Sequence, residues 1–293
     1  MRWTMLVGGL ALGCAGADER AKDSGDGADA SCETGLTAVL VVSELGFTVP
    51  DESGNVAGFD LDGITSTDGD PAGCGHGDAV SPDGETGVDS AFAGLAPLLE
   101  GLGAGAVAGL VQGAVDSGEL LILVELTGLD GPLSPDLNDD CVTFTLHRGA
   151  GAPILGTDGR ILVDQTFGKD TTYPSSGTVQ GRIEEGHFRA DNVDLSLPVQ
   201  ILDEFLVFNV ASASFAFDML EDGDVQGFFA GGVPVDELAG QIAAIDDLGG
   251  LQDVIPPLLE STADLFPDDN GECVELSIGF DMTGRPAFLL DEG

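Results

Sequence analysis

The chain has 293 residues, which is enough for one large domain or two small ones with a substantial core. Acidic residues dominate its charge, with 52 Asp and Glu against 9 Lys and Arg and a formal net charge of −43. We expect no nucleic-acid partner, because phosphate binding requires the opposite sign of charge. The hydrophobic fraction of 43% argues against a disordered chain.

The N-terminal residues 1–13 have the composition of a targeting segment, with Arg2 followed by the short apolar run Met5–Leu12. Small residues then lead into Cys14, an arrangement that resembles the lipobox of bacterial lipoproteins. The resemblance implies cleavage before Cys14 and diacylation of that cysteine, with an ordinary secretory signal as the alternative. Ala15 follows the cysteine, which is similar to lipoproteins that enteric bacteria sort to the outer membrane. We therefore expect a lipid-anchored protein of the cell envelope, in the outer membrane.

Residues 14–34 are polar, rich in small and acidic side chains and without apolar periodicity, so we expect a flexible tether. The apolar, β-branched segment 36–50 predicts the first strand of a single domain over residues 35–293. An acidic, glycine-rich loop over residues 58–89 follows that strand.

The acidic loop 58–89 contains no Lys or Arg. Carboxylates crowded into such a loop repel one another unless they are solvated or gathered around a cation, and Ca²⁺ is bound by oxygen-rich, turn-rich segments of this kind. We expect Ca²⁺ here; an ordinary solvated loop is the alternative, and His76 is interpreted as a loop histidine. The expected metal ligands are Asp60, Asp62, Asp68, Asp70, Asp78, Asp83 and Asp89, with Glu85 nearby.

Two family resemblances concern this loop. Alternating Asp, a Gly, further Asp and then Cys74 loosely resemble the calcium repeats of thrombospondin type 3, without the third Asp before the glycine. The segment Phe59–Gly63 (FDLDG) is similar to the first motif of haloacid-dehalogenase-like phosphatases, which would imply Asp60 as nucleophile. However, Ile64 replaces the Thr of that motif, and Lys169 lies in an unsuitable context for the catalytic lysine. We therefore do not favour the phosphatase.

Once Cys14 is assigned to lipid, an even number of cysteines remains in an exported chain, which predicts two disulfides with three possible pairings. An acidic turn precedes a strand at both Cys141 and Cys273, and this shared context favours pairing those two. Cys32 would then pair with Cys74.

The remaining segments alternate between helical and strand patterns. We expect a Gly-rich helix over 90–116, paired strands over 119–127 and 141–147, half-buried strands over 177–229, helices over 233–247 and 253–266, and a closing hairpin of 274–280 and 286–290. This order predicts an α+β fold, with a mainly antiparallel sheet on which the Gly-rich helix and the two later helices pack.

No catalytic motif stands out. Gly-x-Ser-x-Gly, His-Glu-x-x-His and a phosphate-binding glycine loop ending in Lys are absent from the sequence. His147 and His187 have no partner that the sequence identifies. We therefore expect that the chain is not an enzyme.

The lipobox, the acidic tether and loop, and the closing GEC-VELSIGF segment together resemble acidic lipoproteins of myxobacteria, which are δ-proteobacteria. The resemblance implies export and anchoring and transfers no activity. We expect a membrane-anchored lipoprotein with a structural or binding role at the cell surface, stabilised by Ca²⁺. A carrier of an apolar ligand, held between the sheet and the helices, is the alternative, and a hydrolase is a minor one.

Overall fold

The computed structural model describes residues 35–99, 106–201, 204–244, 253–268 and 270–290. The chain divides into two compact units, Met1–Ala30 and Ser31–Gly293, and all described residues belong to the second. The expected signal peptide 1–13 and tether 14–34, including Cys14 and Cys32, lie outside the described residues.

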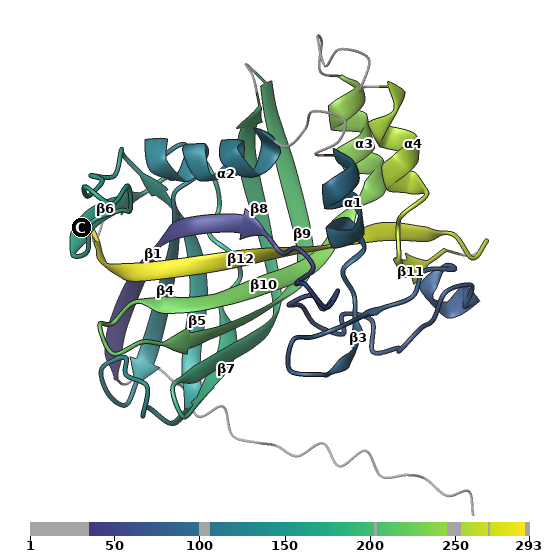
Figure 1. The fold of residues 1–293 in the computed structure, drawn as a ribbon. Helices are drawn as coiled ribbons and strands as arrows, with labels where there is room; N and C mark the ends of the chain where they lie inside the picture. The colour runs from purple at the N-terminus through teal and green to yellow at the C-terminus, as the bar shows by residue number, and fades with distance from the viewer. Residues whose placement is uncertain (1–34, 100–105, 202–203, 245–252, 269, 291–293) are drawn as a thin grey trace, which may run out of the picture. The chain divides into compact units, whose positions relative to one another are not determined.

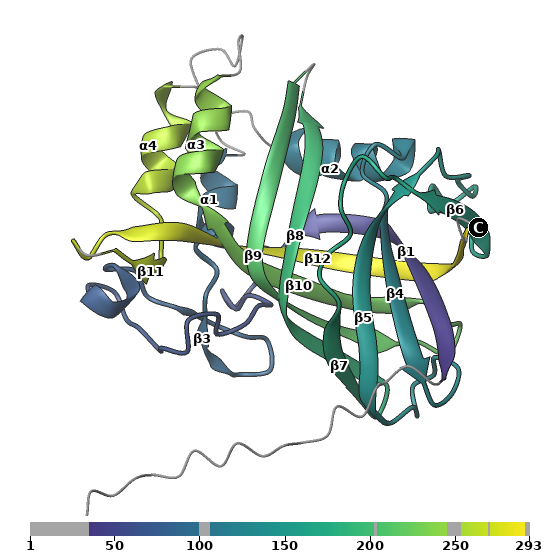
Figure 2. The same cartoon turned by 180° about the vertical axis from the view of Figure 1, so that it is seen from behind.

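Eight strands of the second unit form a closed antiparallel barrel (Figures 1 and 2). Each barrel strand pairs with the next barrel strand along the chain, and the first pairs with the last through a register that includes Val39 opposite Ala287. The barrel strands are β1 (Leu36–Phe47), β4 (Ile122–Leu129), β5 (Asp139–Ala150), β7 (Val179–Glu184), β8 (His187–Ile201), β9 (Glu204–Met219), β10 (Val225–Pro234) and β12 (Cys273–Leu289).

The expected α+β class is wrong, because the structure is mainly β, with 47% strand and 14% helix. The long antiparallel sheet closes on itself, so its apolar face is covered by its own opposite wall and not by a layer of helices. The expected closing hairpin is also wrong, since β12 runs unbroken through Gly284. A Cβ at Gly284 would lie 2.7 Å from the Val225 side chain, so the glycine allows close packing inside the barrel and forms no turn.

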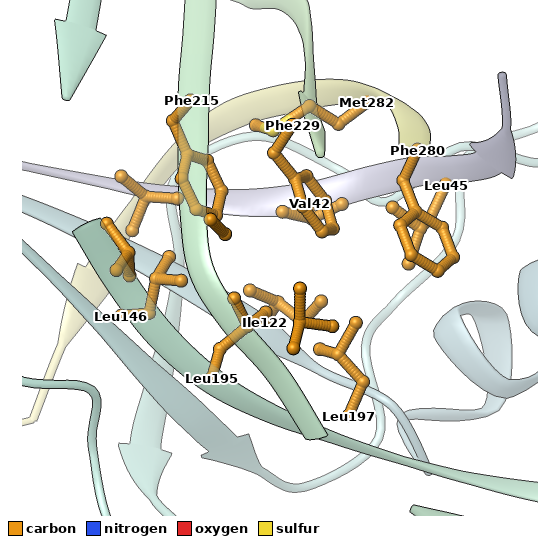
Figure 3. Packing of buried hydrophobic residues seen from close by; sticks show 14 of the residues in the cluster. Val42, Leu45, Ile122, Leu146, Leu195, Leu197, Phe215, Phe229, Phe280 and Met282 are labelled. Carbon is orange, nitrogen blue, oxygen red and sulfur yellow. The ribbon is translucent and has the colours of Figure 1, made fainter. Parts of the chain in front are cut away.

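Aromatic rings pack against one another inside the barrel. A chain of ring contacts runs from Phe144 to Phe215, Phe229 and Phe280, with centroid separations of 5.0, 4.7 and 5.0 Å. All four side chains are buried, as expected from their positions in alternating strands. In Figure 3 the rings of Phe215, Phe229 and Phe280 and the aliphatic side chains of the facing strands, among them Leu195, point toward a common interior.

Three insertions interrupt the series of barrel strands, and they contain all the remaining elements. In place of the expected Gly-rich helix the structure has two short helices, α1 (Ala91–Leu99) and α2 (Ala106–Ser117), and residues 100–105 between them are not described. The two later helices are the short α3 (Val235–Ala243) and α4 (Ile255–Glu260). In the described part of the chain no helix is long and apolar enough to cross a membrane. The inserted elements are η1 (Pro71–Gly73), β2 (Ala79–Val80), β3 (Thr86–Val88), α1 (Ala91–Leu99), α2 (Ala106–Ser117), β6 (Gln165–Lys169), α3 (Val235–Ala243), α4 (Ile255–Glu260) and β11 (Leu265–Pro267).

The acidic loop 58–89 belongs to the first insertion and packs on the outside of the barrel. Phe59 forms a small apolar cluster with Ala216, Ala230 and Phe228 from β9 and β10. The Arg189 guanidinium lies over the Phe59 ring at 4.7 Å from its centroid. The loop is therefore held against the barrel by apolar and cation–π contacts despite its charge.

Candidate functional site

Three of the expected metal ligands come together in the acidic loop. One carboxylate oxygen from each of Asp60, Asp62 and Asp89 lies within 4.8 Å of the others. The backbone bond from Asp89 N to Phe59 O, 2.9 Å, closes the loop and brings its two ends together. An all-oxygen set of this kind suits a hard cation such as Ca²⁺, with further ligands from water or backbone carbonyls.

Asp89 is the most deeply buried of the three carboxylates, with 3% of its surface exposed. Burial foremost, with nearby carboxylates that include Asp62 and Asp264, raises the pKa of Asp89 to about 8. The amide of Leu61 donates to Asp89 Oδ2 at 2.6 Å and acts in the opposite direction. Burial is also the main cause that raises the pKa of Asp62. A cation at this trio would favour the ionised carboxylates.

The other four expected ligands lie outside this trio. Asp78 accepts hydrogen bonds from the Ser66 amide and hydroxyl at 2.5 and 2.6 Å, and Asp70 caps η1 through the Ala72 amide at 3.0 Å. Asp68 and Asp83 also lie outside the carboxylate group among the described residues. These loop positions therefore serve turns and caps.

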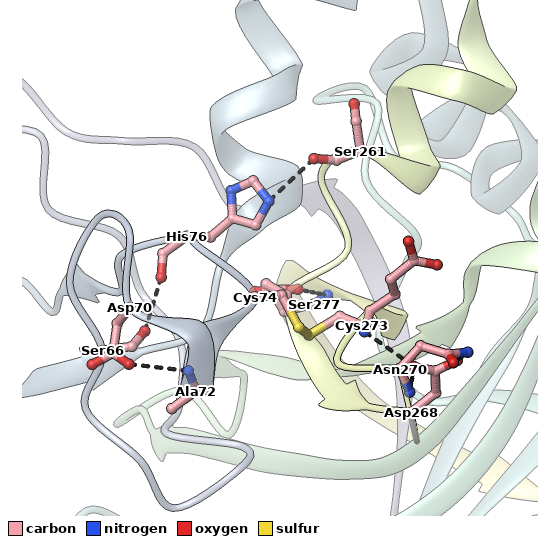
Figure 4. The surroundings of a disulfide bond; sticks show 12 residues. Ser66, Asp70, Ala72, Cys74, His76, Ser261, Asp268, Asn270, Cys273 and Ser277 are labelled. Atoms are coloured by element: carbon pink, nitrogen blue, oxygen red, sulfur yellow. Dashed lines mark hydrogen bonds between the residues drawn. A yellow bond between two sulfur atoms is a disulfide. The ribbon is translucent and has the colours of Figure 1, made fainter.

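The disulfide of the acidic loop differs from the expected pairing. Cys74 is bonded to Cys273 at the start of β12, with a Cα–Cα distance of 5.8 Å (Figure 4). The favoured pairings of Cys141 with Cys273 and of Cys32 with Cys74 are therefore both wrong, although Cys141 is disulfide-bonded as well. Similar sequence context did not identify the partner of Cys273. The pairing depends on the fold, which brings Cys74 of the acidic loop to β12 across a separation of 199 residues. His76 lies beside this bond and contacts the carbonyl of Ser261, 3.1 Å away.

A second candidate site is a pocket at an opening in the barrel wall. β5 pairs with β7 only as far as Phe144 opposite Val179, and beyond Ala190 the strand β8 pairs only with β9. The part of β5 after Phe144 and the part of β8 after Ala190 are therefore not paired with each other, and the segment 173–177 lies at the opening between them. We call the resulting cavity of about 590 Å³ the wall pocket.

The wall pocket has an apolar floor and a polar rim. Its floor consists of side chains that belong to the barrel core: Ile122, Leu146, Leu195, Leu197 and Val210. Its rim carries hydroxyl, amide and charged groups from β5, β8, β9, the segment 173–177 and the start of α3: His147, Arg148, Tyr173, Ser175, Asp194, Asn209 and Glu237. Such a combination is typical of sites for small molecules with one apolar and one polar part.

Arg148 provides a half-buried cation in the wall pocket. Its guanidinium stacks over Tyr173 at 4.4 Å, pairs with Asp170 at 3.4 Å and donates to the carbonyl of Glu119. Arg148 Nη1 has no hydrogen-bond partner, and it is the one such buried side-chain atom among the described residues that line the pocket. An incoming acceptor atom could satisfy it.

His147 has two partners that sequence reasoning missed. Its Nδ1 lies 2.6 Å from Ser175 Oγ and its Nε2 lies 2.7 Å from Glu125 Oε2. Lys169, named in the phosphatase comparison, lies 3.8 Å from the same Glu125 oxygen. The expected pairing of the strands carrying Glu125 and His147 is confirmed, and its register alone would place these side chains diagonally on one face.

Comparison of the chain with protein-family models, with curated proteins and with solved structures finds no match.

Proposed function

We propose that the protein is an exported lipoprotein, anchored through Cys14 in the cell envelope, whose barrel binds the apolar part of a small molecule in the wall pocket. The observation that supports this proposal is the apolar floor of a cavity of about 590 Å³, a size within the usual range for small-molecule sites. An eight-stranded barrel has an interior that can hold one small ligand when side chains do not fill it completely.

The charge around the pocket favours an uncharged ligand. Asp194 and Glu237 lie on the rim, and the chain as a whole has a formal net charge of −43. An anionic amphiphile would be repelled both by these rim carboxylates and by the charge of the whole chain. Among the described residues that line the pocket the one Lys or Arg is Arg148, which is already paired with Asp170. The rim amide of Asn209 bonds Ser196 and Glu237, and its second donor and second acceptor position can recognise an uncharged polar group.

Fluorescence titration with N-phenyl-1-naphthylamine, a neutral apolar probe, tests the proposal. We expect saturable binding to the wild type, competed by uncharged amphiphiles and much less by fatty-acid anions. Ala211→Trp introduces a large side chain from a half-buried position in the pocket lining and should abolish binding. Ala150→Trp, at an exposed position outside the pocket, is the matched control. Equal binding to wild type and Ala211→Trp would refute the pocket as the site.

A second proposed function is Ca²⁺ binding at Asp60, Asp62 and Asp89, supported by the mutual proximity of their carboxylates. Ca²⁺ should raise the unfolding temperature over that in EDTA, and linkage gives about 2.7 kcal/mol at a hundredfold excess over the dissociation constant. Asp60→Asn with Asp62→Asn should remove the effect, whereas Asp83→Asn in the same loop should retain it. An equal effect of Mg²⁺, or none of Ca²⁺, would reduce the trio to an acidic surface.

A further inference from the structure

A continuous hydrogen-bonded relay runs from Ser175 through His147, which both line the wall pocket, to Glu125 on β4. A carboxylate only accepts hydrogen bonds, so the contact with Glu125 assigns the proton of neutral His147 to Nε2. Nδ1 then carries the lone pair and accepts the hydroxyl proton of Ser175. This proton arrangement is the one that a histidine needs in order to act as a general base toward a serine.

The relay is held by the barrel wall. Glu125 and His147 are neighbours on the outward face of the paired strands β4 and β5, and His147 is 6% exposed. The backbone of Ser176 donates to the carbonyl of Leu146 at 2.9 Å, and the Ser176 hydroxyl accepts from the Leu146 amide at 2.9 Å. These two bonds fix the segment that carries Ser175, which is itself exposed. The base is thus rigid and buried while the hydroxyl is accessible.

We propose that Ser175, His147 and Glu125 form a hydrolytic centre for uncharged carboxylic esters whose apolar chain lies in the wall pocket. The substrate class depends on the proposed function, because the pocket supplies the apolar site and disfavours anions. Ser175 is the nucleophile, His147 is the general base, and Glu125 is a positioning residue that fixes the imidazole tautomer. The two ring nitrogens exchange the roles that they have in the familiar serine-protease triad, but either nitrogen can accept and return a proton.

In the first step Ser175 Oγ attacks the ester carbonyl carbon while its proton passes to His147 Nδ1. The bond between that carbon and the alkoxy oxygen then breaks, and the same proton goes to the departing alcohol, which leaves an acyl group on Ser175. A water molecule next loses a proton to Nδ1 and attacks the acyl carbon. The proton returns to Ser175 Oγ, and a carboxylic acid is released.

The charge that develops on the carbonyl oxygen requires a donor, and we assign this role to Arg148 as the described pocket residue with a buried, unpartnered donor atom. Arg148 follows His147 directly on β5, lines the same pocket and holds Nη1 buried without a partner among the described residues. A preorganised donor of this kind favours a transition state that carries more negative charge than the bound ester.

Covalent labelling with a neutral fluorophosphonate, followed by peptide mapping, tests the nucleophile directly. We expect an adduct on Ser175 of the mature wild-type protein and none in Ser175→Ala. Ser53→Ala, which removes another exposed loop hydroxyl, should leave labelling unchanged. An adduct confined to another residue, or no adduct, would overturn the proposal.

Hydrolysis of p-nitrophenyl butyrate distinguishes the role of Ser175 as nucleophile from the role of Glu125 as positioning residue. Ser175→Ala should abolish turnover, and Glu125→Gln should lower kcat by about a hundredfold or more with little change in KM, because a neutral amide no longer enforces the tautomer. If the relay were only structural, Glu125→Gln would change the unfolding temperature and leave the labelling rate of Ser175 unaltered. Turnover that persists in Ser175→Ala would also overturn the proposal.

The binding assay distinguishes failure of this inference from failure of the proposed function. Ser175→Ala should still bind N-phenyl-1-naphthylamine, because the hydroxyl belongs to the rim and not to the apolar floor. Probe binding without a Ser175 adduct would remove the hydrolytic centre and retain the binding protein. An adduct without probe binding would retain the nucleophile and remove the pocket as its substrate site.

Discussion

Asp89 makes the stability of the protein depend on pH in an unusual direction. Its pKa is raised from 3.8 to about 8, so the folded protein holds a proton that the unfolded chain releases between about pH 4 and pH 8. The contribution of Asp89 to stability is fully present below about pH 4, and it is lost as pH rises through this window. The complete shift corresponds to an upper bound of about 5–6 kcal/mol in the free energy of unfolding.

Urea unfolding in EDTA at pH 5, 6, 7 and 8 measures this effect. We expect the free energy of unfolding to fall by up to about 1.4 kcal/mol per pH unit. Asp89→Asn should flatten the dependence, because the amide carries no charge and its oxygen can still accept from Leu61. Asp264, whose pKa burial chiefly raises to about 6, acts in the same direction up to about pH 7, so the comparison of pH 7 with pH 8 separates Asp89 from Asp264.

The pH dependence of Ca²⁺ stabilisation tests the protonation of Asp89 independently. Because the cation must displace the Asp89 proton, its stabilising effect should grow between pH 6 and pH 8. Asp83→Asn, in an exposed turn of the same loop, should leave both dependences intact. Stability that rises from pH 6 to 8 in EDTA, or an unchanged slope in Asp89→Asn, would contradict the assigned burial of the charge.

Three further predictions concern the rest of the molecule. Replacing Cys74 and Cys273 together by Ser removes a link across 199 residues and should lower the free energy of unfolding by about 5 kcal/mol on the chain-entropy model, measured by urea titration. Phe229→Ala should cost about 3–5 kcal/mol in the same titration, because the ring is 2% exposed between two others, whereas exposed Phe288→Ala should cost little. Labelled palmitate should enter the wild type and not Cys14→Ser, and equal labelling would remove the lipoprotein proposal.

The local pattern of apolar and polar residues predicted most of the strands, but it did not predict that the sheet closes into a barrel. Alternation of buried and exposed residues is a property of neighbouring residues, so the pairing of β4 with β5 followed from two adjacent apolar segments. The pairing of Val39 with Ala287 joins the two ends of the domain, and no period in the sequence encodes it. Without that pairing the sheet needed helices to cover its face, which is why an α+β arrangement was expected.

The acidic loop illustrates the same limit at a site. The sequence identified a loop rich in carboxylates, but seven aspartates were expected to be ligands and the structure brings three together. Asp60 and Asp62 are only two positions apart in sequence, whereas Asp89 joins them because the loop returns to Phe59. The relay was harder still, since Ser175 lies in no motif and reaches His147 through a turn whose geometry composition does not specify.

The two proposed sites differ in what fixes their geometry, and this difference predicts how each responds to local unfolding. Asp60, Asp62 and Asp89 all belong to the first insertion, so their spacing depends on the loop and on its tie to β12 through Cys74. The imidazole and carboxylate of the relay belong instead to paired barrel strands, and only the hydroxyl comes from an insertion. Replacing Cys74 and Cys273 together by Ser, which leaves the disulfide of Cys141 intact, should therefore weaken Ca²⁺ binding and leave Ser175 reactive. A loss of both together would mean that the barrel wall itself depends on the acidic loop.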